Sequence, residues 1–166
     1  MAVAGGVSEI EDDVRELVRR RGLDPLTDPA AISRLVSEVI ADYDELSLSG
    51  GVPLLSDPGA AARRVIDAVA GFGPLQRYLD DPTVEEVWIN EPGRVFIARR
   101  GVSELTNTIL TADAVRDLVE RMLKTSGRRV DLSTPFVDAV LPDGSRLHVV
   151  IPDITQRHWA VKTAHR

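Results

Sequence analysis

The stretch Phe136–Ile151, FVDAVLPDGSRLHVVI, decides the class of fold. Two apolar-rich segments, 136–141 and 146–151, flank Pro142-Asp143-Gly144-Ser145. This tetrapeptide favours a tight turn, because Pro fixes φ, Asp bonds nearby backbone and Gly tolerates positive φ. A four-residue connection between two such segments predicts a β-hairpin, and therefore antiparallel pairing.

The preceding sequence repeats this pattern of short strands joined by turns. The expected strands are 84–89, 94–98 and 102–105, with turns at 90–93 and 100–101. A last strand is expected around Trp159, Val161 and Thr163. Meanders and hairpins of this kind predict an α+β domain with a mainly antiparallel sheet.

One helix interrupts the strands. Thr111 can cap its start and Gly127 can close its end. Between them, five apolar residues share one helical face: Val115, Leu118, Val119, Met122 and Leu123.

The N-terminal part is predicted to be helical. Asp28-Pro29 and Asp57-Pro58 each place a capping carboxylate before a proline suited to the first helical position. Between these helices, the polar, glycine-containing stretch Ser47–Pro53 is predicted to be a hinge. We therefore expect an acidic helical region with its linker at 1–52 and an α+β domain at 57–166.

Composition excludes several classes of function. The 166 residues include no cysteine, which rules out disulfides, thiolate metal sites and a cysteine nucleophile. The three histidines show no metal-ligand spacing. Residues 1–60 hold 12 acids and 5 bases, so we expect no binding of nucleic acid by the whole chain. Residues 128–166 hold 4 acids and 6 bases, and this part could receive an anion. We expect neither a membrane span nor a secretory signal.

No motif for nucleotide hydrolysis is present. Lys124-Thr125 and Lys162-Thr163 both lack the preceding glycine that a phosphate-binding loop needs. Asp80-Asp81 and Glu85-Glu86 could act as paired acids, but a helix end and a solvated strand start explain them better.

Two arginine-bearing turns are the candidate sites. Arg128 and Arg129 follow a helix, and Arg146 follows the hairpin turn. Guanidinium groups beside exposed backbone can hold a phosphate or carboxylate. The structural alternatives are that Arg128 and Arg129 neutralise the helix C-terminus, and that Arg146 forms a salt bridge with Asp138. The two tryptophans, Trp88 and Trp159, are expected to pack in the core or an interface.

Several phrases in order resemble the N-terminal domain of type II/type IV secretion ATPases, most closely the CpaF/TadA-like branch of tight-adherence pili. They are 71–75 (GFGPL), 81–90 (DPTVEEVWIN), 127–131 (GRRVD) and 137–146 (VDAVLPDGSR), followed by a strand at 161–163. The resemblance covers roughly residues 71–163.

This resemblance implies a PAS-like α+β domain that precedes a RecA-like motor in a homohexameric ring. It implies a cytoplasmic location at the inner face of the cell membrane, beside a membrane platform protein of the secretion or pilus machinery. It further implies nucleotide sensing, with Arg146, Arg128, Arg129 and Lys162 as the residues that approach the phosphates. ATP and Mg would be bound only together with a motor domain, and we expect the isolated chain to bind neither and to hydrolyse no ATP.

The sequence departs from the family in two respects. It ends at Arg166 without Walker motifs, and Lys162-Thr163 stands where the family has two basic residues. An alternative function is therefore a non-enzymatic interaction protein that docks on a full-length secretion ATPase or on its membrane partner. A third is an unrelated small α+β binding domain.

Overall fold

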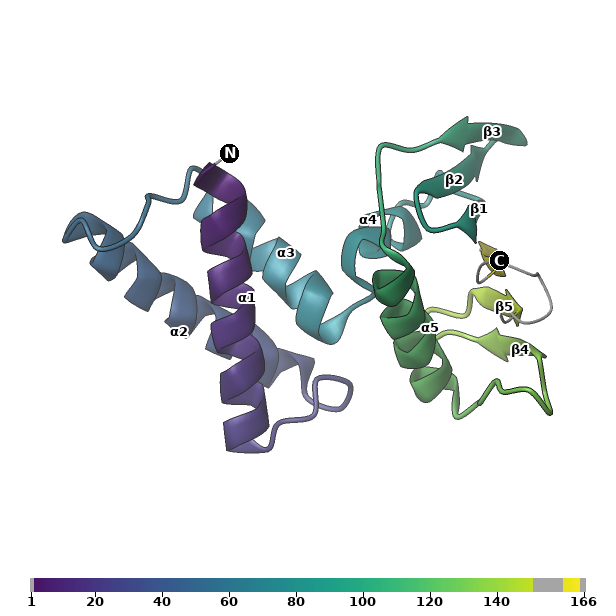
Figure 1. The fold of residues 1–166 in the computed structure, drawn as a ribbon, viewed down its shortest axis with the longest axis horizontal. Coiled ribbons are helices and arrows are strands. Elements are labelled where there is room, and N and C mark those ends of the chain that lie inside the picture. Colours follow the sequence, from purple (N-terminus) through teal and green to yellow (C-terminus); the bar gives the residue numbers. More distant parts are fainter. Residues whose placement is uncertain (1, 151–159, 165–166) are drawn as a thin grey trace. The chain divides into compact units, whose positions relative to one another are not determined.

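The computed structural model describes residues 2–150 and 160–164 (Figure 1). The chain divides into two units, which we call the helical unit, up to Pro74, and the sheet unit, from Leu75. Helices come first and an antiparallel sheet follows, which confirms the predicted α+β class.

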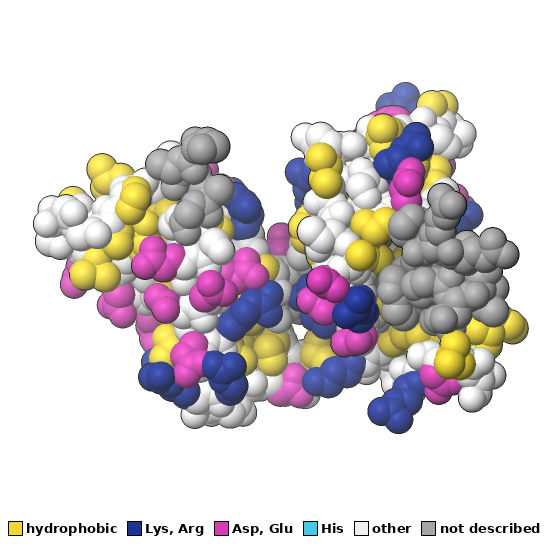
Figure 2. Space-filling model, in the orientation of Figure 1, with side chains coloured by type: hydrophobic (Ala, Val, Ile, Leu, Met, Phe, Trp, Pro, Cys, Tyr) yellow, Lys and Arg dark blue, Asp and Glu magenta, His cyan; other side chains and the backbone are white. Residues whose placement is uncertain are grey.

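Three helices that each contact the other two form the helical unit. They are α1 (Ala2–Arg21), α2 (Pro29–Leu48) and α3 (Pro58–Ala70). The Asp28 carboxylate caps α2 by accepting from the Ala31 N–H at 2.9 Å, and Asp57 caps α3 by accepting from Ala60 at 2.8 Å. These are the two Asp-Pro starts that the sequence predicted. Figure 2 shows Asp and Glu side chains spread over the visible face of this unit.

The expected boundary between 52 and 57 is wrong, because α3 belongs to the helical unit. Val65 and Val69 are buried in the same core as residues of α1 and α2, such as Ile10 and Leu35. The predicted hinge is an ordered connection. Its Val52 packs against that core, and the Gly51 N–H donates to the Leu46 carbonyl at 3.0 Å. The apolar face of α3 therefore determines which unit this helix joins, and the glycine-containing composition of the segment before it does not mark the boundary.

A six-stranded sheet in the order β3-β2-β1-β6-β5-β4 forms the sheet unit, and every neighbouring pair is antiparallel. The strands are β1 (Glu86–Glu91), β2 (Arg94–Arg99), β3 (Val102–Leu105), β4 (Phe136–Val140), β5 (Arg146–Val150) and β6 (Ala160–Ala164). A 3-10 turn, η1 (Gly73–Leu75), and a short helix, α4 (Gln76–Leu79), precede them. Trp159 lies outside the described residues, and Trp88 stacks on Phe96 with ring centroids 5.6 Å apart.

Helix α5 (Ala112–Ser126) lies along one face of the sheet (Figure 1). All five residues predicted for its inner face are buried. Alternate residues of the strands face the same core, among them Val87, Leu147 and Val149. This alternation leaves the other residues of each strand, including Arg146, on the opposite face. No helix in the described part of the chain is long and apolar enough to cross a membrane.

Candidate anion-binding site

The C-terminus of α5 positions Arg128. Gly127 ends the helix in the left-handed conformation, with φ 66° and ψ 17°. Its N–H donates to the Lys124 carbonyl at 3.3 Å, and the Arg128 N–H donates to the Leu123 carbonyl at 3.1 Å. These bonds turn the chain sharply out of the helix, so Arg128 leaves at a fixed position.

The β4–β5 turn positions Arg146. The Asp143 carboxylate accepts from both the backbone N–H and the hydroxyl of Ser145, each at 2.9 Å. Gly144 adopts φ 86°, and the Leu141 N–H donates to the Ser145 carbonyl at 2.9 Å. The turn is therefore closed by its own polar groups, and Arg146 begins β5 directly after it.

These two elements bring Arg128 and Arg146 together at one open hollow of ≈ 570 Å³. It is lined by Ser126, Arg128, Asp138, Ala139, Val140, Arg146 and Leu147. Within residues 2–150 and 160–164, neither guanidinium forms an ion pair. Two guanidinium groups that form no described ion pair, in a hollow whose described lining holds one carboxylate, make an arrangement that can receive an anion.

The predicted salt bridge between Arg146 and Asp138 is wrong. The β4–β5 register places Asp138 opposite His148 and places Val140 opposite Arg146. The Asp138 carboxylate accordingly contacts the His148 Nδ1 atom at 2.8 Å. No role was predicted for His148 from the sequence. Only the exact register of the hairpin shows that His148 lies opposite Asp138.

The other two predicted site residues lie elsewhere. Arg129 is exposed and does not line the hollow. Lys162, on β6, forms an ion pair with Glu86 of β1, with Nζ and Oε1 2.9 Å apart. The structure therefore places Arg128 and Arg146 at the hollow, whereas Lys162 does not line it and is paired with Glu86.

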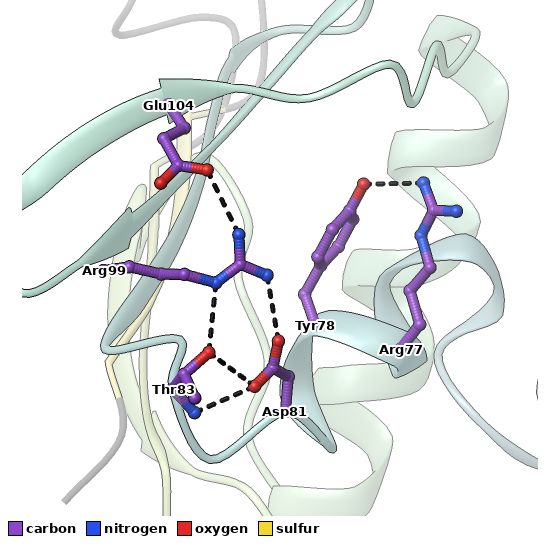
Figure 3. A network of polar contacts seen from close by, with 6 residues as sticks. All are labelled: Arg77, Tyr78, Asp81, Thr83, Arg99 and Glu104. Carbon is purple, nitrogen blue, oxygen red and sulfur yellow. Dashed lines mark hydrogen bonds and ion pairs between the residues drawn. The ribbon is translucent and has the colours of Figure 1, made fainter.

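The acidic pairs of the sequence have structural roles. Figure 3 shows Asp81 bound by Thr83 and by Arg99, whose Nη2 atom lies 2.9 Å from the carboxylate. The Thr83 hydroxyl, followed by the Arg99 guanidinium, lowers the pKa of Asp81 to about 2. Glu85 accepts from the Gly101 N–H at 2.8 Å. These contacts fix loops at the sheet edge, and among the described residues no three His, Asp or Glu side chains could hold a metal ion together.

A second polar cluster joins α4 to Thr108, in the segment after β3, and Figure 3 shows its members Arg77 and Tyr78. The Arg77 Nη2 atom donates to the Tyr78 hydroxyl at 2.6 Å and to the Thr108 hydroxyl at 2.7 Å. Tyr78 and Thr108 are both buried, so this cluster satisfies polar groups inside the fold.

Comparisons with known proteins relate this chain to secretion ATPases. Protein VirB11 of Agrobacterium fabrum is 33% identical over 81 residues, which cover 48% of this chain and 23% of VirB11. The uncharacterized protein MJ0781 of Methanocaldococcus jannaschii is 36% identical over 86 residues, or 50% of this chain and 12% of that protein. No family model matches the sequence.

A solved structure gives the same relationship. It is the VirB11 ATPase from the Brucella suis type IV secretion system in complex with sulphate, with a TM-score of 0.52 and 28% sequence identity. The match covers 56% of this chain and 29% of that one. About half of this chain is therefore homologous to part of the VirB11 secretion ATPases, and the chain spans less than a quarter of the length of these curated relatives.

Proposed function

We propose that the sheet unit is a nucleotide-sensing and ring-assembly module of a type II/IV secretion or pilus ATPase of the CpaF/TadA-like branch. In this proposal, Arg128 and Arg146 contact the terminal phosphates of ATP that a motor domain holds. The single observation that carries it is the placement at one hollow of two arginines that form no ion pair with another described residue.

The chemistry of the two arginines suits this ligand. A guanidinium presents a planar fork of N–H donors that matches phosphate oxygens, and it stays charged at every physiological pH. Two such groups supply fixed positive charge where negative charge accumulates during phosphoryl transfer. The homologous VirB11 is an ATPase, which supports the phosphates of a nucleotide as the ligand class.

The proposal extends to the surroundings of the protein. We place it at the cytoplasmic face of the inner membrane, in a homohexamer or with a full-length secretion ATPase, next to a membrane platform protein. ATP and Mg are bound with the motor domain. Arg129 and Lys162 take no part in the refined site, because neither lines the hollow.

Titration with inorganic tripolyphosphate tests the site. Arg128→Ala and Arg146→Ala should each weaken binding about 10- to 100-fold, which is the value of one charge-assisted hydrogen bond. Both variants should keep the thermal stability of the wild type, since neither guanidinium has a described ion pair. Arg129→Ala is the matched control, because this exposed neighbour does not line the hollow. Equal affinity of all four proteins would refute the proposed site.

The rate of ATP hydrolysis distinguishes a nucleotide-sensing module from a protein that only docks on a secretion ATPase. In an ATPase completed by joining this chain to a VirB11-type motor domain, Arg146→Ala should slow hydrolysis on the order of 100-fold. Unchanged turnover, together with lost tripolyphosphate binding, would favour a non-enzymatic interaction protein instead.

A further inference from the structure

One carboxylate lines the same hollow as the two arginines, and it belongs to Asp138. A carboxylate there repels an incoming anion and can itself pair with a guanidinium. In the described part of the chain it pairs with neither arginine. Its contact is with His148, whose Nδ1 atom lies 2.8 Å from Oδ1.

The strand register places both His148 and Arg146 within reach of Asp138. Asp138 on β4 lies directly opposite His148 on β5, and Arg146 lies two residues before His148 on the same face. A diagonal neighbour of this kind is about 7–8 Å away between backbones, which a long side chain can span. Arg146 could therefore reach Asp138, and the hydrogen bond to His148 competes with that ion pair.

The described charges around His148 come from four strands. Asp138 faces it from β4, and Lys162 lies opposite it on β6. Arg146 shares its strand and face, while Glu86 of β1 binds the Lys162 ammonium. Among the described residues, Asp138 is therefore the acid that directly contacts His148.

We propose that His148 is a positioning residue that holds Asp138 away from Arg146 and Arg128 and thereby keeps the hollow open to anions. This inference rests on the proposed function of the hollow as an anion site. Histidine changes its charge between about pH 5 and 8. A protonated imidazole both holds the carboxylate more firmly and cancels its charge, so anion affinity rises as the pH falls. A neutral imidazole can still donate one hydrogen bond to Asp138 but no longer cancels its charge, so the carboxylate repels an anion more strongly and competes more for the arginines.

Sulfate titrations of the full chain, monitored by NMR at several pH values between 8 and 5.5, test this inference. Sulfate is the suitable probe because its own charge is constant over this range. Affinity of the wild type should rise up to about fivefold, the range expected for an exposed ion pair. His148→Gln keeps a polar side chain without a titrating proton, so the sulfate affinity of this variant should not rise as the pH falls.

Asp138→Asn should bind sulfate more tightly than the wild type at pH 8 and lose most of the pH dependence. Glu120→Gln is the matched control, because Glu120 is exposed on α5 and does not line the hollow. The inference is overturned if the wild-type pH profile persists in both His148→Gln and Asp138→Asn.

The anion site and the role of His148 can be refuted separately. If Arg128→Ala and Arg146→Ala do not weaken sulfate binding at any pH, then the anion site itself is wrong. If they weaken it while Asp138→Asn behaves as the wild type, then only the role of His148 is wrong.

Discussion

The conformation of Gly127 should control the stability of the sheet unit by a predictable amount. Gly127 has φ 66°, in the left-handed region, and a Cβ atom added there would meet nothing within 4 Å. The cost of Gly127→Ala is therefore a backbone cost without a steric contribution. The left-handed conformation costs a non-glycine residue roughly 1–2 kcal/mol, and the stiffer unfolded chain returns about 0.4–1 kcal/mol. We expect a net loss of about 1 kcal/mol in the free energy of unfolding.

Gly93→Ala provides the matched control. A Cβ atom at Gly93 would likewise meet nothing within 4 Å, but Gly93 has no positive φ. This substitution should be neutral or slightly stabilising, through the unfolded chain alone. Gly127→Asn should recover part of the loss, because asparagine tolerates the left-handed conformation.

Urea denaturation monitored by tryptophan fluorescence measures these differences, since Trp88 lies on β1 of the sheet unit. A loss of 1 kcal/mol corresponds to a fall in melting temperature of about 4–8 °C for a domain of this size. Equal stability of Gly127→Ala and Gly93→Ala would refute the reasoning, because the two sites differ in φ and not in available space.

Two further predictions concern the rest of the fold. Asp81 has its pKa lowered to about 2 by Thr83 and Arg99, so its contribution to stability is present above about pH 4 and is lost as the pH falls toward 2. The free energy of unfolding of Asp81→Asn should therefore fall less than that of the wild type between pH 4 and 2. Parallel curves of the free energy of unfolding against pH would contradict this prediction. Val65→Ala should remove about 2 kcal/mol from the helical unit, because Val65 is fully buried against α1 and α2. Its far-UV circular dichroism transition should shift more than its tryptophan fluorescence transition, and equal shifts would contradict the assignment of α3 to the helical unit.

Elements with strong local signals could be predicted from the sequence. The caps Asp28, Asp57 and Thr111 each accept the hydrogen bond expected of them, and Gly127 closes α5 as predicted. Each of these signals depends on residues within one turn of the chain. The order of the strands in the sheet is different, because β6 inserts between β1 and β5 and this pairing joins residues far apart in the sequence. No local pattern specifies such a pairing.

The candidate site shows the same limit within a single hairpin. Pairing across a connection of Pro142–Ser145 would put Leu141 opposite Arg146. In the structure, Leu141 belongs to the turn, is buried, and bonds to Ser145, so that Val140 pairs with Arg146. A change of one residue in register exchanges the faces of a strand. The sequence therefore identified Arg146 but not its neighbours, and the pair of Asp138 and His148 became visible only with the register.

The way the two arginines are held explains how an exposed site can still be organised. Arg128 directly follows the Gly127 cap, and Arg146 follows a turn closed by Asp143 and Ser145. In both cases the backbone leading to the arginine is fixed by hydrogen bonds to residues at most five positions away. Such bonds require no partner from a distant part of the chain, so the backbone position of each arginine is set within the sheet unit. The two turns are far apart in the sequence. The packing of α5 against β4 brings them together. The position of each arginine in the chain is thus set locally, and the proposed binding of one anion by both arginines would depend on the tertiary fold.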